Sequence, residues 1–150
     1  MGVRSGPCKA LFETPCIMDT LTYSNICIQK YTKEQDLEIC VIQLHTQENT
    51  VIILCLYRAP SGNFENFLNL FDKILNSLHK PKTEFIICGD ININYMETSN
   101  NMKRLDDLLA TYNLTSIVKF PTRIVDKSST RIDNILIEGT RNYTIKPYIN

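Results

Sequence analysis

The sequence lacks the features that mark several common classes of protein. It contains no tryptophan, only two histidines and only five glycines among its 150 residues. It has no Gly-x-x-x-x-Gly-Lys-Ser/Thr segment to hold phosphates, which argues against a P-loop nucleotide hydrolase. No apolar run approaches the roughly 18 residues of a transmembrane helix, and the N-terminus lacks the apolar core of a signal peptide. We therefore expect neither a membrane partner nor a small-molecule cofactor.

The six cysteines do not follow a metal-binding pattern. They form no Cys-x-x-Cys pair, and neither histidine stands at the spacing of a zinc ligand from any of them. Cys40, Cys55 and Cys88 lie inside apolar runs, where a reduced cysteine behaves as a small hydrophobic residue. Because disulfides persist mainly in oxidising compartments, this usage predicts an intracellular, reducing location, either the cytoplasm or the nucleus.

Length and composition fit one soluble globular domain, since 43% of the residues are hydrophobic and the charges are mixed. The formal net charge is zero, but six of the 16 basic residues and only three of the 16 acidic ones lie between residues 115 and 150. The basic residues of this part are Lys119, Arg123, Lys127, Arg131, Arg141 and Lys146. This local charge favours phosphate contact, although scattered basic residues more often form a solvated surface.

Apolar periodicity predicts an α/β chain. Strands are expected at 22–30, 37–44, 51–57, 84–88, 116–120 and 132–137, helices at 64–78 and 99–113, a polar loop at 121–130, and irregular structure at 1–20. The polar turn at 47–50 should join its two flanking strands into an antiparallel hairpin, and Asn63 should cap the first helix. Both hairpin strands are apolar at nearly every position, so we expect the sheet to be covered on both faces there.

The segment 84–94 changes character after an apolar run. Gly89 permits close backbone approach, and Asp90, Asn92 and Asn94 then follow at every second position. If the strand continues, these three side chains share one face and offer oxygen atoms, which suit Mg²⁺ and a phosphate. The alternative is that Gly89-Asp90 is only a turn and that the asparagines are its solvated exit.

Polar residues also gather at the ends of other predicted strands. Tyr57 and Arg58 close one strand, and Asp133 opens another on the same face as Ile135, so its carboxylate should be partly buried. Taken singly, Tyr57 fits an aromatic residue at the core edge, and Asp133 fits a cap for a loop amide. Together with Asp90 they favour a functional site, because α/β sites form at strand ends.

Three segments carry a resemblance to a known family. They are Tyr57-Arg58-Ala59-Pro60, Gly89-Asp90-Ile91-Asn92 and Ser129-Thr130-Arg131-Ile132-Asp133-Asn134-Ile135. In this order and spacing they resemble the endonuclease/exonuclease/phosphatase family, and more narrowly the apurinic-type endonuclease domain of insect non-LTR retrotransposons. The resemblance runs from about residue 21 to residue 150 and implies a DNase I-like α/β (α+β) fold, a partial two-sheet β-sandwich flanked by helices.

The resemblance also implies Mg²⁺-dependent cleavage of a DNA phosphodiester. Asp90 would orient or deprotonate the attacking water and provide a weak, incomplete metal site. Asn92 and Tyr57 would contact the scissile phosphate, while Asp133 would fix the tautomer of a catalytic histidine. The residues expected to bind the DNA substrate are Arg58, Asn94, Arg123, Lys127, Ser129, Thr130, Arg131 and Asn134.

Two parts of the family pattern have no counterpart in this sequence. The metal-binding glutamate is not found, since Glu13 follows no apolar strand, and the closing Ser-Asp-His is absent. Neither His45 nor His79 is placed to replace the histidine. We therefore expect a domain truncated at both ends, with a sheet edge open to self-association. It is either part of an enzyme whose missing strands lie in a longer gene product, or a catalytically dead remnant that at most binds nucleic acid weakly.

Overall fold

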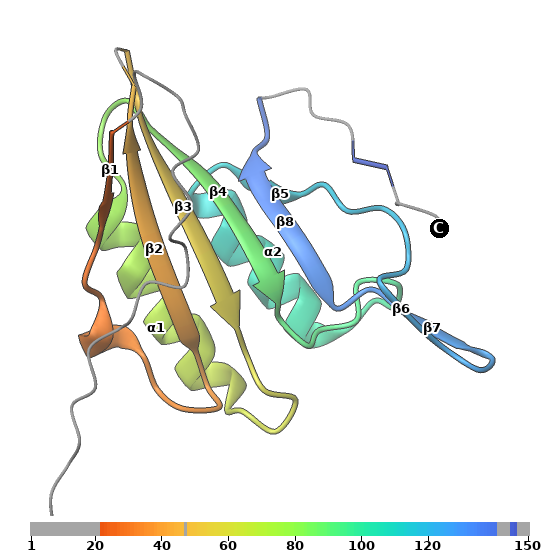
Figure 1. Cartoon of the computed structure of the whole chain (residues 1–150). Helices are drawn as coiled ribbons and strands as arrows, with labels where there is room; N and C mark the ends of the chain where they lie inside the picture. The colour runs from red at the N-terminus through yellow and green to blue at the C-terminus, as the bar shows by residue number, and fades with distance from the viewer. Residues whose placement is uncertain (1–21, 47, 141–144, 147–150) are drawn as a thin grey trace, which may run out of the picture.

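Six strands form one mixed sheet in the computed structural model, which describes residues 22–46, 48–140 and 145–146 (Figure 1). Their order across the sheet is β1-β2-β3-β4-β8-β5. The strands are β1 (Thr22–Asn25), β2 (Glu38–His45), β3 (Thr50–Tyr57), β4 (Thr83–Asp90), β5 (Leu114–Ser116) and β8 (Asp133–Glu138). A separate two-stranded sheet pairs β6 (Arg123–Val125) with β7 (Ser128–Thr130). The segment 1–20, predicted to be irregular, lies outside the described residues, as do Glu13 and Arg141.

The predicted hairpin and crossover are both confirmed. Strands β2 and β3 pair antiparallel along their whole length, and β3 pairs parallel with β4 after the helix α1 (Phe64–Leu78). Asn63 caps α1 as predicted, because its side chain accepts a hydrogen bond of 3.0 Å from the backbone N–H of Asn66. The second helix, α2 (Asn100–Thr111), is capped by Ser99 in the same way.

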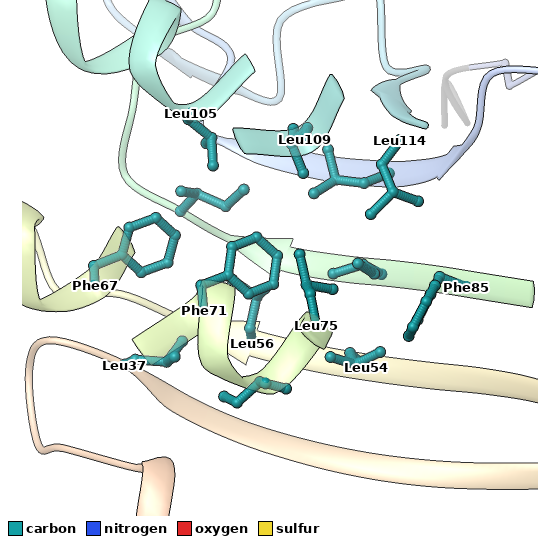
Figure 2. Close-up of a cluster of buried hydrophobic side chains, with 14 of the residues drawn as sticks. Leu37, Leu54, Leu56, Phe67, Phe71, Leu75, Phe85, Leu105, Leu109 and Leu114 are labelled. Carbon is teal, nitrogen blue, oxygen red and sulfur yellow. The ribbon is translucent and has the colours of Figure 1, made fainter. Parts of the chain in front are cut away.

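Both helices pack on one face of the sheet and enclose the core between them and the strands (Figures 1 and 2). Helix α1 has apolar side chains at helical spacing, and three of them, Phe67, Phe71 and Leu75, are completely buried. They meet side chains of the strands, such as Leu54 and Phe85, in one cluster. Leu105 and Leu109 of α2 extend this cluster over β4, β8 and β5.

The opposite face of the sheet is covered by neither helix, so the prediction that the hairpin strands are covered on both faces was wrong. Along β3, Leu54 and Leu56 are buried, whereas Cys55 and Tyr57 between and after them are exposed. On β4, Ile86 is likewise exposed. We call this second surface, which carries Cys40, Cys55, Tyr57, Ile86, Cys88 and Asp90, the open face.

Three shorter elements also differ from the sequence prediction. The strand expected at 22–30 ends at Asn25 and is followed by a short 3-10 helix, Gln29–Tyr31. The strand expected at 116–120 is β5, which ends at Ser116, and the polar loop expected at 121–130 contains the hairpin of β6 and β7.

Strand β1 is an exposed edge of the large sheet. Self-association through that edge stays a prediction. None of the helices in the described ranges is long and apolar enough to cross a membrane.

Candidate functional site

Three polar residues lie in one row across the end of the sheet. Strand register pairs Tyr57 of β3 with Asp90 of β4, and Asp90 with Asp133 of β8. Register partners on neighbouring strands share a face, and their backbones lie about 4.8 Å apart across the sheet. We call Tyr57, Asp90 and Asp133 the acidic row. The structure therefore brings together, on the open face, three of the four residues predicted to be catalytic.

The fourth, Asn92, lies in a loop directly after β4. The strand ends at Asp90, so Asn92 and Asn94 are not placed by strand alternation as the sequence suggested. Asn92 has a left-handed backbone, with φ of 52°, and its N–H donates to Asp90 Oδ1 at 2.9 Å. This Asx turn is a geometry that asparagine tolerates well. Ile91 and Ile93 are buried and anchor the loop.

The asparagine side chains tie the loop to its neighbours. Asn92 Nδ2 donates to the backbone oxygen of Arg58 at 2.8 Å. Asn94 Oδ1 accepts hydrogen bonds of 3.1 Å from the backbone N–H groups of Met96 and Arg131. Both amides thus hold neighbouring backbone segments at fixed positions around Asp90. The phosphate contacts that the resemblance implied for them stay a prediction.

Arg58, predicted to bind substrate, points into the protein. Its side chain is only 5% exposed, and its guanidinium donates to the backbone oxygens of Ile91 and Gly62 at 3.2 Å each. It also lies over the rings of Phe64 and Phe67, 5.8 and 5.9 Å from their centroids. Burial lowers the pKa of Arg58, while the charges of nearby carboxylates oppose that shift. In this position Arg58 supports the loop after β4 from beneath, with its guanidinium turned toward the core.

Two other predicted substrate contacts are also turned away from the open face. Asn134 is 2% exposed, and its Oδ1 accepts a hydrogen bond of 2.7 Å from the hydroxyl of Ser116. The guanidinium of Arg131 donates to the backbone oxygens of Val118 and Tyr95 at 2.9 and 2.7 Å. Because side chains alternate along a strand, Asn134 must face the helices when its neighbour Asp133 faces away from them.

The remaining predicted contacts lie on the hairpin of β6 and β7, which projects past the end of the sheet (Figure 1). Arg123, Lys127 and Ser129 are exposed, and Thr130 is half-buried. Burial raises the pKa of Asp90, and the positive charge of Arg123 opposes part of that rise, so the hairpin acts electrostatically on the acidic row. Thr122, which no sequence signal marked, anchors this hairpin, because its hydroxyl accepts from the N–H groups at positions 132 and 133, each at 3.2 Å.

Burial raises the pKa of Asp90, and the negative charge of Asp133 adds to the shift. The N–H of Asn92 opposes it by stabilising the carboxylate. Asp133 itself is exposed, so the prediction that its carboxylate is partly buried was wrong. The reason is that Asp133 lies on the open face, where no described helix covers it.

Replacing Asp90 with asparagine should stabilise the fold at neutral pH. A raised pKa means that ionising Asp90 costs folding free energy once the pH rises above the ordinary aspartate value, about 3.9. Asparagine retains an oxygen that can accept from Asn92. We expect Asp90→Asn to raise the free energy of unfolding at pH 7 by at most about 1 kcal/mol and to leave it unchanged at pH 3. Urea unfolding at both pH values measures this, and Asp107→Asn on the exposed side of α2 controls for net charge.

The histidines of the chain lie away from the acidic row. His45 ends β2 and pairs with Thr50 at the start of β3. Thr50 precedes Tyr57 by seven residues along this strand, which is a distance of roughly 23 Å. His79 is the exposed C-cap residue of α1, and its ring stacks on Phe85 near the start of β4. Within the described ranges, no group of three or more histidine, cysteine, aspartate or glutamate side chains is arranged to hold a metal ion. The row thus supplies two carboxylates without a histidine beside them.

The sequence of the chain matches the model of a known protein family. The family model described as endonuclease-reverse transcriptase matches residues 51–144, which include the whole acidic row and the hairpin. The chain belongs to the endonuclease-reverse transcriptase family. This confirms the resemblance to retrotransposon endonucleases that the three sequence segments carried. No curated protein sequence matches the chain.

Solved structures of the same fold include the endonuclease domain of TRAS1, a telomere-specific non-LTR retrotransposon. It has 16% identity and a TM-score of 0.64, with 80% of this chain and 55% of that chain covered. D. rerio TDP2, solved with a single-strand DNA product, has 12% identity and a TM-score of 0.52 over 83% of this chain and 56% of that one. The chain thus spans little more than half the length of these structures. The likeness confirms the DNase I-like α/β fold.

Proposed function

We propose that this chain is part of a Mg²⁺-dependent endonuclease domain that binds DNA through its phosphodiester backbone. The observation that carries the proposal is the acidic row, with two carboxylates and a tyrosine in register at the end of the sheet. Family membership supports it, as does the resemblance of the fold to a TDP2 structure that contains a DNA product. The domain would comprise residues 21–150.

The chemistry of the row fits a divalent cation in part. Asp90 and Asp133 present two carboxylates from neighbouring strands, and their repulsion helps to raise the pKa of Asp90. A cation between them would remove this repulsion, and hard cations prefer such oxygen ligands. Mg²⁺ takes six ligands, so water and phosphate oxygens would have to complete the site and its affinity would be weak. When bound, the ion would supply positive charge to the phosphate oxygens during cleavage.

The protein groups around this position have distinct roles in the proposal. Asp90 orients the attacking water or accepts its proton, while the Tyr57 hydroxyl donates to a phosphate oxygen. Asn92 contributes to phosphate binding from the loop, which Arg58 supports from below. Asp133 would hold a catalytic histidine in one tautomer. Such positioning and charge neutralisation provide most of the rate enhancement in phosphoryl transfer.

The second candidate is a catalytically inactive remnant that at most binds nucleic acid weakly. It is favoured by the position of the histidines, since His45 and His79 both lie far from Asp133. In this candidate the acidic row lacks the general acid or base that would complete it. A reducing location in the cytoplasm or nucleus fits both candidates, because Cys27, Cys40, Cys55 and Cys88 are free thiols.

Mg²⁺ should strengthen DNA binding through the acidic row, and this tests the proposed function. Without a divalent cation, the carboxylates of the row repel phosphate. We expect millimolar Mg²⁺ to raise the affinity of the unaltered chain for a labelled duplex relative to its effect on Asp90→Asn. The ratio of the affinities with and without Mg²⁺ should be roughly three- to tenfold larger for the unaltered chain than for the variant. Fluorescence anisotropy in Mg²⁺ and in EDTA measures both affinities. Asp107→Asn removes the same charge elsewhere; if it behaves like Asp90→Asn, phosphate does not meet the row.

The hairpin should supply salt-dependent affinity. Arg123 and Lys127 are exposed cations on β6 and in the turn that follows it. Each phosphate contact adds about 0.9 to the slope of log affinity against log salt concentration. The double variant Arg123→Ala/Lys127→Ala should therefore lower that slope by about 2 and weaken binding to every duplex alike. Lys73→Ala/Lys103→Ala, on the exposed sides of the helices, is the matched control, and an equal loss there would mean nonspecific charge attraction.

A further inference from the structure

A cavity lies between helix α2 and strand β5, on the side of the sheet that carries the helices. Its volume is about 390 Å³, within the range of roughly 300–1,000 Å³ that is usual for small-molecule sites. Both helices pack on this side (Figure 1), so access to the cavity does not depend on what covers the open face. Met102 and Ala110 of α2 and Leu114 of β5 give the cavity an apolar wall.

The rest of the lining is polar and carries a net positive charge. Lys119 and Arg131 contribute two cations, and Asp106 contributes one carboxylate. That carboxylate already has a partner, because the hydroxyl of Tyr95 donates to Asp106 Oδ1 at 3.0 Å. Burial raises the pKa of Tyr95, and the charge of Asp106 adds to the rise, so the hydroxyl keeps its proton and remains a donor. The lining therefore presents a surplus of one positive charge to an occupant.

Unpaired hydrogen-bond donors gather at this cavity. Of the three buried side-chain atoms that have no hydrogen-bond partner in the described part of the chain, two are Arg131 Nε and Asn134 Nδ2. Arg131 lines the cavity, and both of its terminal nitrogens already donate to backbone oxygens. Asn134 is 2% exposed and touches the lining at Ser116, whose hydroxyl donates to Asn134 Oδ1 at 2.7 Å. Because a buried donor without a partner is costly, this region favours an occupant that brings acceptor atoms.

We propose that this cavity binds a small organic monocarboxylate with an apolar body. The carboxylate would accept from Arg131 Nε and from the ammonium of Lys119. That ammonium has three donors and gives one to the backbone oxygen of Ser116 at 2.8 Å. A monoanion matches the surplus charge, and its apolar body would cover the apolar wall. Inorganic phosphate fits less well, because it has no apolar part. The ligand takes no part in phosphodiester cleavage, so the proposal does not depend on the nuclease function.

The test is an NMR titration of the folded, ¹⁵N-labelled chain at pH 7 and constant ionic strength. Three probes are compared: benzoate as a ligand of the proposed kind, benzamide as its neutral analogue of the same shape, and inorganic phosphate. We expect benzoate to bind with a dissociation constant of about 1 mM, roughly tenfold below the constants for benzamide and phosphate. The amide signals that shift should belong to residues 95, 102–119 and 131.

Four results would overturn the proposal. They are equal binding of benzoate and benzamide, phosphate binding as tight as that of benzoate, shifts spread over the exposed lysines and arginines, and no saturation by about 50 mM benzoate. The last result would mean that the cavity holds only water. The titration of the unaltered chain needs no variant to fold, so it decides the question by itself.

Two pairs of variants locate the site. Lys119→Met should weaken benzoate binding about fivefold or more, whereas Lys103→Met removes the same charge from an exposed position of α2 and should leave it unchanged. Ala110→Phe should fill the cavity and abolish binding, while Thr111→Phe adds the same ring at the next exposed position of the helix and should not. Equal loss in Lys103→Met and Lys119→Met would show nonspecific charge attraction and contradict the proposal.

Discussion

Gly89→Ala will prevent the chain from folding, or will lower its free energy of unfolding by about 4 kcal/mol or more. Gly89 has a φ of 148°, a region that other residues rarely occupy. A Cβ atom there would lie 1.8 Å from the backbone oxygen of Leu56 and 2.8 Å from its backbone carbon. These atoms belong to β3, and moving them would break its pairing with β4 beside the acidic row. Loss of this size approaches the total stability of an ordinary domain.

Gly139→Ala provides the matched control. A Cβ at this exposed position would come no closer than 3.5 Å to another atom, which is ordinary van der Waals contact. We therefore expect a change within about 0.5 kcal/mol. Circular dichroism and urea unfolding of both variants measure the difference. Similar stability of the two alanine variants would show that β3 and β4 do not approach each other as described.

The long elements could be predicted because their signals are local. Helix α1 repeats apolar residues at helical spacing after an asparagine cap, and the strands of the hairpin are apolar runs around a polar turn. Short strands carry no such signal. Three-residue strands such as β6 and β7 exist because they pair with each other, and Thr122 helps to hold their hairpin against β8.

The open face could not be predicted from apolar content alone. A strand that is apolar on both sides is usual where helices cover both faces of a sheet. Here Cys55 and Ile86 are exposed although they lie in apolar runs. Only the arrangement of α1 and α2 on the same side of the sheet decides which half of each run is buried.

The convergence of three candidate site residues at one end of the sheet could be predicted, whereas their roles stay a prediction. Tyr57, Asp90 and Asp133 meet because strand order and register bring three strand ends together, and their motifs marked those ends. Asn134 was expected on the side of the substrate, but its side chain faces the helices. Strand alternation with its neighbour Asp133 would have predicted that orientation. Arg58 follows the end of β3, where no periodicity fixes direction, and its burial depends on the backbone oxygens of distant loops.

The 150-residue chain should not cleave DNA at an enzymatic rate. Two carboxylates are fewer ligands than Mg²⁺ needs, and weak metal binding loses charge stabilisation that is typically worth several kcal/mol. No described histidine lies near Asp133, and a missing general acid or base commonly costs about 10²–10⁴-fold in rate. The two losses need not add, because catalytic groups that act as a unit are non-additive.

Nicking of supercoiled plasmid in Mg²⁺ measures this, with the chain compared with its Asp90→Ala variant and with an EDTA control. We expect the same trace of nicked product in all three, since neither loss has to be complete for the rate to fall to background. Asp90→Ala is the decisive comparison, because a contaminating nuclease would be unaffected by it. Robust nicking that Asp90→Ala abolishes would mean that residues outside the described ranges complete the site, and the remnant hypothesis would then be wrong. Nicking could stay at background in all three samples while DNA binding still responds to Mg²⁺ through Asp90. That result would show that the chain binds DNA without cleaving it.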